Sequence, residues 1–445
     1  MPKITHRKKR LSSFKLIVLG FAGVIVLGAL ILMLPFSSTA GVVTPFHEAL
    51  FTSTSAVCVT GLVVQDTGSY WSAFGQTVIL LLIQIGGLGV VTVAALFAML
   101  SGRKISLMQR STMQDAISAP KVGGIVRLTR FIVRGTFLIE LIGMIVMLPT
   151  FCGNYGFKGI WMAAFHSVSA FCNAGFDILG TAENKYPSLT GYIGNPAINI
   201  TIMLLIIVGG IGFLTWDDIY TNKWHFKKYR MQSKVILVTT AILIIAPAVF
   251  FFFCDFTGLP LSERILASLF QSVTPRTAGF NTADLPAMTG SSKAIMTLLM
   301  LVGGSPGSTA GGMKTTTLAV LILSAFSVCR KKDDAEVCGR RIDGSAVKNA
   351  AAVAVMYFLL FFVGGIVIST AEGLPLSTCL YETASAVGTV GLTLGITPQL
   401  GVLSQLILIV LMYLGRVGGL TLIYAAVSNK NQSGAKLPLE KITVG

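Results

Sequence analysis

Four short segments of the chain share a spacing that could place backbone oxygens around one cation. They align without gaps as FTSTSAVCVTGL, FHSVSAFCNAGF, LFQSVTPRTAGF and YETASAVGTVGL. Their glycines, Gly61, Gly175, Gly279 and Gly391, are 114, 104 and 112 residues apart. Glycine accepts positive φ angles and lets the backbone approach a ligand closely. The repeat therefore predicts four loops whose carbonyl groups replace the hydration shell of an ion.

In each loop, the glycine and the two residues before it would supply these carbonyls. Their side chains differ from loop to loop, which is expected if the backbone holds the ion. The absence of a ring of Asp or Glu at these positions argues against a calcium site and favours a monovalent cation. For any single loop, a glycine needed only for a tight turn or for helix packing is the favoured interpretation, whereas four aligned copies favour the ion site. The predicted ion-binding residues are Val59, Thr60, Gly61, Asn173, Ala174, Gly175, Thr277, Ala278, Gly279, Thr389, Val390 and Gly391.

Arg276 differs from its counterparts in the other loops because it places a positive charge three residues before a loop glycine. A guanidinium group pointed at the ion would oppose a cation. We therefore expect Arg276 to turn away and pair with a carboxylate behind the loop. Glu140, a carboxylate well inside an apolar stretch, is expected to pair with an arginine such as Arg134 or Arg276, and a role as an ion ligand is less favoured.

A second candidate site is the segment VGGSPGSTAGGMKT at 302–315, inside an apolar run from about 294 to 326. Five glycines and a proline should break a helix there. Broken backbone at membrane depth is tolerated only where protein or water satisfies its polar groups. The segment is therefore predicted to lie across a permeation path as a gate. The predicted gate residues are Gly303, Gly304, Ser305, Pro306, Gly307, Ser308, Thr309, Ala310, Gly311, Gly312, Lys314 and Arg416.

Two of these gate residues are basic. Arg416 lies within an apolar span, where an arginine is costly unless it faces water or a partner. It could form an electrostatic barrier below the glycine loops, or it could cap carbonyls of the broken helix. Lys314 could repel cations, or it could extend to the inner membrane surface.

Composition places the chain among membrane proteins. Hydrophobic residues make up 53% of it and charged residues 12%, against about 25% charged in soluble proteins. Stretches of about 20 apolar residues can cross a bilayer as helices. We expect an all-α polytopic membrane protein with spans near 16–35, 74–101, 127–150, 196–220, 234–256, 293–327, 348–371 and 402–427.

The positive charge is distributed unevenly between the two sides of the predicted membrane. Segments 1–15, 102–134, 221–234, 330–348 and 428–445 hold 27 of the 34 Lys and Arg residues. The positive-inside rule puts these segments and both termini in the cytoplasm of a cell-membrane protein. The net charge of +16 therefore indicates contact with anionic lipid or an acidic cytoplasmic partner, and no nucleic acid.

Each glycine loop belongs to one of four units: a span, a short helix of about 11 residues, the loop and a second span. The second spans contain glycine pairs at 86–87, 209–210, 303–304 and 418–419. Two spans return the chain to its starting side, so all units share one orientation and can surround a central pore. The predicted divisions are an N-terminus at 1–15, repeats at 16–101, 102–220, 221–327 and 328–427, and a tail at 428–445.

The loops CVTGL, CNAGF, RTAGF and GTVGL, the segment VGGSPGSTAGGMKT and LGRVGGLT in the last span resemble the Trk/Ktr/HKT superfamily of potassium transporters. Within this superfamily the chain most resembles the Ktr membrane subunit, because only about 15 residues precede the first span. The resemblance implies a potassium-conducting homodimer, often stimulated by Na⁺, on a ring of cytoplasmic nucleotide-binding regulatory subunits. It also implies no organic cofactor on this chain. Glycine at position 61, where some sodium-transporting members have serine, favours K⁺ as the transported ion.

Alternative functions remain open at this point. A sodium or non-selective monovalent cation transporter of the same fold is one, because only Thr389-Val390-Gly391 matches part of the potassium-channel sequence TVGYG. A secondary transporter for an organic substrate is less favoured, because it should have inverted repeats. A membrane enzyme is not expected, because H-E-x-x-H, G-x-S-x-G and Walker A motifs do not occur at plausible sites.

Overall fold

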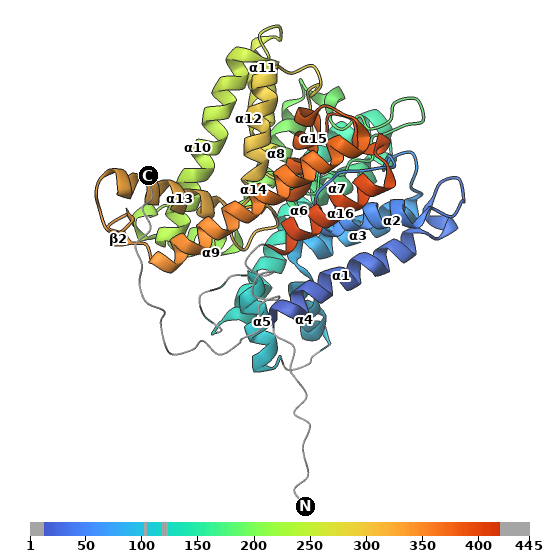
Figure 1. Ribbon diagram of the computed structural model, residues 1–445. Coiled ribbons are helices and arrows are strands. Elements are labelled where there is room, and N and C mark those ends of the chain that lie inside the picture. Colours follow the sequence, from blue (N-terminus) through green and yellow to red (C-terminus); the bar gives the residue numbers. More distant parts are fainter. Residues whose placement is uncertain (1–12, 102–104, 118, 120, 122, 419–445) are drawn as a thin grey trace, which may run out of the picture.

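The computed structural model describes residues 13–101, 105–117, 119, 121 and 123–418, which form helices joined by loops (Figure 1). Four long apolar helices could each cross a membrane. They are α1 (Ser13–Leu32), α6 (Ile125–Tyr155), α10 (Met231–Cys254) and α14 (Gly344–Glu372). These correspond to the first predicted span of each unit. Their unburied faces carry large apolar side chains, as lipid-facing helices require.

A short buried helix follows each long one and packs against it. These helices are α2 (Phe46–Val57), α7 (Lys158–Phe171), α11 (Leu261–Val273) and α15 (Leu376–Gly388). At 12 to 14 residues, they are too short to cross a bilayer. Hydroxyl groups anchor them: Ser53 Oγ donates to the Ile25 carbonyl at 2.7 Å, and Thr383 Oγ1 to that of Phe361 at 3.0 Å.

In the first three units the second span is not a continuous helix. A break was predicted only in the third unit, so the spans predicted at 74–101 and 196–220 are corrected. The helices α3 (Ala73–Leu88) and α4 (Val90–Leu100) meet at a 96° bend, and α8 (Pro196–Gly210) and α9 (Phe213–Asn222) at 98°. In the third unit, α12 (Gly290–Leu301) and α13 (Thr315–Cys329) are separated by a non-helical segment. In the fourth, α16 (Val402–Val417) ends at Gly418, and the predicted remainder of that span lies outside the described residues.

Glycines shape these second spans in two ways. Gly89, Gly212 and Gly418 have φ angles of 84°, 90° and 87° where the helices end, a conformation that other residues rarely adopt. Three residues earlier, Gly86, Gly209 and Gly415 pack against the ends of α2, α7 and α15. An added Cβ at any of the three would lie 2.1 Å from a carbonyl oxygen. The structural counterpart of Gly86 is therefore Gly415, and not Gly418 as the glycine pairs suggested.

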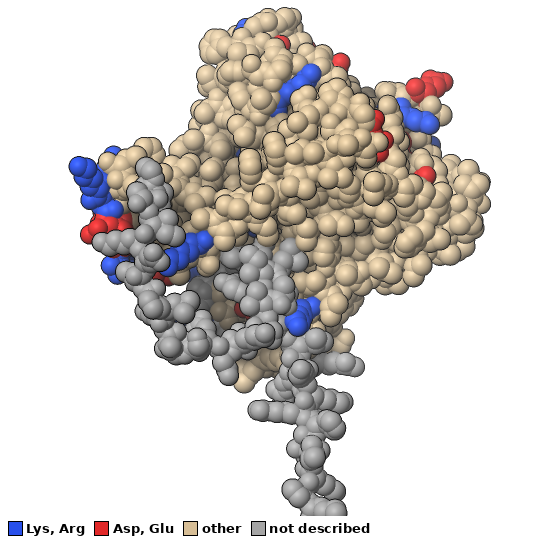
Figure 2. Space-filling model, viewed as in Figure 1, with Lys and Arg blue, Asp and Glu red and all other residues tan. Residues whose placement is uncertain are grey.

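The remaining elements lie in the connections between and within the units. Helix α5 (Leu107–Ile117) packs against α1 and α4, and β1 (Glu336–Val337) pairs antiparallel with β2 (Arg340–Arg341). Short 3-10 helices are η1 (Pro35–Ser37), η2 (Thr190–Tyr192), η3 (Phe226–Lys228) and η4 (Thr397–Gln399). Figure 2 shows that most of the charged side chains on this face lie toward its margins, around a broad surface of uncharged residues.

Candidate functional site

The four loop glycines converge on one closed ring. A Cβ added to Gly61 would lie 2.4 Å from the Ala174 carbonyl oxygen, and one on Gly175 would lie 2.6 Å from that of Ala278. A Cβ added to Gly279 would lie 2.4 Å from the Val390 carbonyl oxygen, and one on Gly391 would lie 2.1 Å from that of Thr60. Each loop therefore touches the next, and the fourth returns to the first. The structure brings together the predicted residues from all four loops.

The backbone of each loop has the same unusual conformation. Val59, Asn173, Thr277 and Thr389, each two residues before the glycine, have φ angles of 57°, 60°, 67° and 53°. The glycines themselves have φ angles of 95°, 68°, 82° and 96° in chain order. Positive φ at non-glycine residues is uncommon and is found where surrounding structure imposes it. Nothing in the side chains of Val59 or Thr389 signals this conformation, so the sequence could not predict it.

Hydroxyl and backbone groups of the short helices hold the loops. The Gly61 amide donates to Ser55 Oγ at 3.0 Å, and the Gly391 amide donates to Ser385 Oγ at 2.9 Å. In the second loop, Ser169 Oγ donates instead to the Phe176 carbonyl at 2.8 Å. These serines were not predicted as part of the site, although each stands six residues before a loop glycine.

The third loop is closed differently. In the other loops, the amide of the residue before the glycine donates to the carbonyl five residues earlier in the chain. For example, the Thr60 amide donates to the Ser55 carbonyl at 2.8 Å. In the third loop, Ala278 bonds only four residues back, to Thr274, at 3.0 Å. Thr274 also donates through its hydroxyl to the Phe280 carbonyl. Pro275 lies inside this turn and has no amide hydrogen to contribute.

The prediction that Arg276 pairs with a carboxylate is wrong. The side chain is 4% exposed and turns to α10, where Nη2 bonds Thr240 Oγ1 at 3.4 Å. Within the described residues, no carboxylate forms an ion pair with it. Glu140 is likewise not paired with Arg134 or Arg276. Its carboxylate accepts from Gln84 Nε2 at 3.4 Å.

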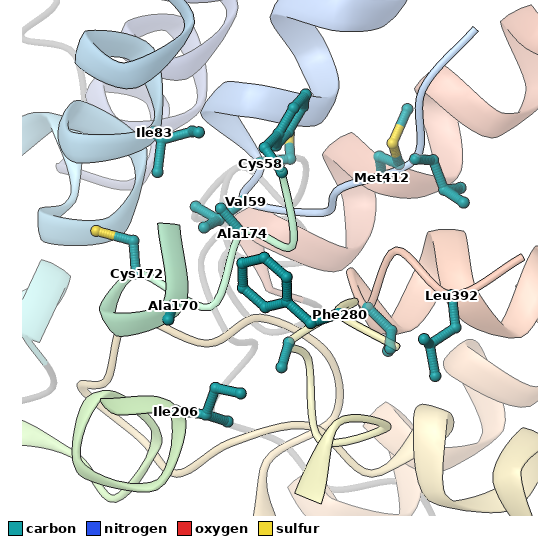
Figure 3. Close-up of a cluster of buried hydrophobic side chains, with 14 of the residues drawn as sticks. Cys58, Val59, Ile83, Ala170, Cys172, Ala174, Ile206, Phe280, Leu392 and Met412 are labelled. Carbon is teal, nitrogen blue, oxygen red and sulfur yellow. The ribbon is translucent and has the colours of Figure 1, made fainter. Parts of the chain in front are cut away.

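Apolar side chains surround the ring. Figure 3 shows Val59, Ala174 and Phe280, from three of the loops, gathered in one buried cluster. Leu392, from the fourth loop, belongs to the same cluster. This packing excludes water from behind the loops, so their positions are fixed by surrounding structure.

The segment between α12 and α13 lies directly against one loop of the ring, and it confirms the predicted break in the helix. A Cβ on Gly311 would lie 2.1 Å from Thr389 Oγ1, and one on Gly312 would lie 2.9 Å from the Gly388 carbonyl. The segment also contacts the bend in the second unit, where the Ser305 amide donates to the Gly210 carbonyl at 2.9 Å. The two ends of the segment are joined by a hydrogen bond, in which the Gly303 amide donates to the Met313 carbonyl at 2.8 Å.

The two basic residues hold this segment through carbonyl groups. Arg416 donates to the carbonyls of Thr309 and Gly86, and to that of Gly87 at 3.4 Å. It therefore bridges the segment to the bend of the first unit, as the capping interpretation expected. Lys314 Nζ donates to Ala310 O at 2.8 Å and to Gly311 O at 3.3 Å. It bonds the segment and does not extend along the helix away from it.

A cavity of about 240 Å³ adjoins the segment. Gly307, Lys314 and Arg416 line it, together with Asp115 and Ile117 of α5. A Cβ on Gly307 would lie 2.5 Å from the Ile117 carbonyl oxygen. Helix α5 therefore also contacts the segment. The described residues contain no group of three His, Cys, Asp or Glu side chains able to hold a metal ion.

An acidic side chain lies just beyond the second loop. Asp177 follows Gly175 by two residues and is half-buried. Burial, together with the carboxylate of Asp66, raises the pKa of Asp177 from 3.8 to about 7. Its charge is therefore sensitive to pH near neutrality. Asp177 could not be predicted from the repeat, because the other three loops have Val63, Asn281 and Thr393 at this position.

Together, the long apolar helices and the closed ring of loops define a multi-pass helical membrane protein of the transporter class. The sequence profile of the TrkH family, described as "Cation transport protein", matches residues 14–434. The chain belongs to this family. Its crystal-structure neighbour "Potassium Transporter TrkH from Vibrio parahaemolyticus" superposes with a TM-score of 0.75 at 18% identity, covering 96% of this chain and 87% of that one.

Curated relatives match over almost their full length. The chain is 39% identical to the potassium/sodium uptake protein NtpJ of Enterococcus hirae, covering 98% of each chain. It is 37% identical to the Ktr system potassium uptake protein B of Bacillus subtilis, covering 97% of this chain and 96% of that protein. The Ktr system protein B of Vibrio alginolyticus is 33% identical, with 92% and 90% covered.

Proposed function

We propose that the chain is the ion-conducting subunit of a potassium uptake system and that K⁺ passes through the ring of glycine loops. The observation that carries this proposal is the cyclic contact in which each loop glycine abuts the carbonyl of the next loop. Carbonyl oxygens arranged around an axis can replace the hydration shell of K⁺. The names of the relatives, which include potassium and potassium/sodium uptake proteins, support the same choice of ion.

The segment from Gly303 to Gly312, with Lys314 and Arg416, is proposed as the gate beneath the ring. Support comes from its contact with Thr389 and from the bonds that Arg416 makes to it. Opening requires these bonds to break, so the closed state is favoured by charge-assisted hydrogen bonds. A guanidinium group beside the path also opposes a cation electrostatically until the segment moves.

We also propose the arrangement in the cell. Both termini lie in the cytoplasm, because the basic segments follow the positive-inside rule. The term "Ktr system" in the names of several relatives supports an assembly with other components. We propose that these are a ring of nucleotide-binding regulatory subunits below a homodimer of this chain. Stimulation by Na⁺ belongs to the same proposal.

Rubidium uptake into vesicles that contain the purified chain tests the function. Rb⁺ stands in for K⁺, and uptake is measured against competing K⁺ and Na⁺, with and without Na⁺ present. K⁺ should compete strongly and Na⁺ weakly. Changing Gly61→Ser adds a side chain where the Ala174 carbonyl lies 2.4 Å from an ideal Cβ, so the preference for K⁺ should fall.

The matched control is Gly23→Ser, because nothing lies within 4 Å of a Cβ at Gly23. This variant should retain both the rate of uptake and the preference for K⁺. A K⁺ preference that survives Gly61→Ser in a folded protein would count against the ring as the selective element. Equal competition by Na⁺ in the unaltered chain would favour the alternative of a non-selective monovalent cation transporter.

A further inference from the structure

A cavity of about 700 Å³ lies away from the ion pathway, between the start of α6 and helix α9. Lys121, Arg127 and Arg230 line it together with Phe131, Asp217 and Tyr220. We propose that this cavity binds the headgroup of an anionic phospholipid, with an acyl chain lying along the outer face of α6. The site is separate from the ring and from the proposed gate, and nothing in the proposed transport mechanism uses it.

The basic side chains of the cavity are not equivalent. Arg230 is bound to Asp217 at 3.0 Å and to Asp218 at 3.3 Å, so its charge is already compensated. Lys121 and Arg127 are exposed, and neither forms an ion pair within the part of the chain that the structure describes. Two uncompensated positive charges therefore face a cavity large enough for a phosphate group and its substituent. Such a cavity favours an anion.

Backbone amides add to this charge. Helix α6 begins at Ile125, after Gly124 with φ 82° and ψ −2°, and no side chain caps it. Its first turn contains no acidic residue. Uncapped amides at the start of a helix attract anions, because the helix dipole is positive there. The amides, Lys121 and Arg127 thus act on the same region of the cavity.

The outer face of α6 identifies the ligand as a lipid. Arg127 and Arg134 are two helical turns apart and therefore lie on one face, with exposed Arg130 between them. The next turns of this face carry large side chains that are 46–58% exposed: Phe137, Leu138, Leu141, Ile142, Ile145 and Val146. The basic patch matches the anionic headgroup of a phospholipid, and the exposed apolar column next to it matches an acyl chain. A soluble phosphate would use only the basic part.

Helix α9 supplies the other wall of the cavity. Its Tyr220 is 73% exposed and its ring lies 5.3 Å from that of Phe131. Aromatic side chains of this kind are enriched at the level of lipid headgroups. Helix α9 follows a 98° bend from α8, so the two helices cannot both run across the membrane. This geometry is consistent with α9 at the membrane surface.

The position of α9 also connects the lipid site to the proposed gate. Its first residue, Phe213, donates through its amide to the Gly307 carbonyl at 2.7 Å. A lipid bound along α9 would therefore bias the segment that contains Gly307. This consequence rests on the proposed gate, whereas lipid binding itself does not.

Native mass spectrometry of the delipidated full-length protein tests the binding. Phosphatidylglycerol is titrated against phosphatidylcholine, for the unaltered chain and for the double variant Lys121→Gln/Arg127→Gln. The control is Arg340→Gln/Lys348→Gln, which removes two exposed positive charges from outside the cavity. We expect tighter binding of phosphatidylglycerol, weakened about 30-fold by the first double variant because two basic contacts are lost. The control should bind like the unaltered chain.

Equal weakening by both double variants, or none by the first, would overturn the site, provided that all three proteins unfold at the same temperature. Displacement of phosphatidylglycerol by equimolar inorganic phosphate would overturn the assignment to a lipid. The same proteins can be assayed for rubidium flux in vesicles with and without phosphatidylglycerol. Binding without any lipid effect on flux would overturn the coupling through α9, and loss of transport in all vesicles would bear only on the proposed function.

Discussion

The ring of glycine loops and the layer next to it differ in symmetry. Every unit contributes one loop to the ring, and each loop makes the same contact with the next. In the adjoining layer the units differ: the first two bend at Gly89 and Gly212, the third provides the non-helical segment, and the fourth provides Arg416. A binding site that surrounds an ion needs equivalent contributions. A barrier that opens needs only one movable part and one residue to hold it.

The ring should tolerate substitution least. In Gly391→Ala, the new Cβ would lie 2.1 Å from the Thr60 carbonyl oxygen, at a φ of 96°. Two adjacent loops must then shift, and rubidium uptake should fall about 100-fold, the scale expected when a fitted site is displaced by about 1 Å. The control Gly191→Ala, with nothing within 4 Å, should leave uptake unchanged. Normal uptake in folded Gly391→Ala would contradict the ring as the path.

The gate should respond in the opposite direction. Arg416→Ala removes the bonds to Thr309 and Gly86, so the segment is released and rubidium flux should rise. The loss of one charge-assisted hydrogen bond to the segment should increase the equilibrium constant for opening about tenfold. Arg330→Ala removes an exposed arginine at the end of α13 and should have no effect. Unchanged or reduced flux in a folded Arg416→Ala protein would indicate that Arg416 only stabilises the fold.

The serines behind the first and fourth loops should have an intermediate effect. Ser385→Ala removes the hydroxyl that accepts from the Gly391 amide, a bond with a net value of about 1 kcal/mol. The loop becomes less well fixed, and the preference for Rb⁺ over Na⁺ should fall about fivefold. Competition assays with the exposed Ser345→Ala variant as control check this expectation. An unaltered preference would show that packing alone holds the loop.

Most of the ring could be predicted from the sequence because the glycine loops repeat four times and the helix break at 303–312 is local. What could not be predicted depends on contacts between distant residues. Pro275 shifts the closure of the third loop, Thr240 replaces the expected carboxylate beside Arg276, and Gly415 takes the position assigned to Gly418. In each case the residue types were visible, but the partner was supplied by another helix.

The smallest expected effect concerns pH and Asp177. Its pKa is raised from 3.8 to about 7, so the carboxylate loses its charge as pH falls through 7. A negative charge near the second loop attracts cations, and uptake should therefore fall about twofold between pH 8 and pH 6. Asp177→Asn should remove this dependence, while the exposed Asp333→Asn should retain it. A pH profile unaffected by Asp177→Asn would assign the titration to another group.

The raised pKa of Asp177 also determines how the free energy of unfolding changes with pH. The folded protein favours the protonated carboxyl, so the contribution of this group to the free energy of unfolding decreases as pH rises from about 4 to about 7. Thermal unfolding of the unaltered protein and Asp177→Asn at several pH values separates this contribution from the effect on transport. A difference between the two proteins that did not change with pH would contradict the raised pKa.

Anomalous diffraction from crystals of the protein soaked in Rb⁺ or Tl⁺ would locate the bound ions. We expect anomalous density inside the ring bounded by Gly61, Gly175, Gly279 and Gly391, reduced by competing K⁺ and lost in Gly391→Ala. Density confined to another position, or a ring that stays empty at high Rb⁺ while the protein transports Rb⁺ in vesicles, would contradict it.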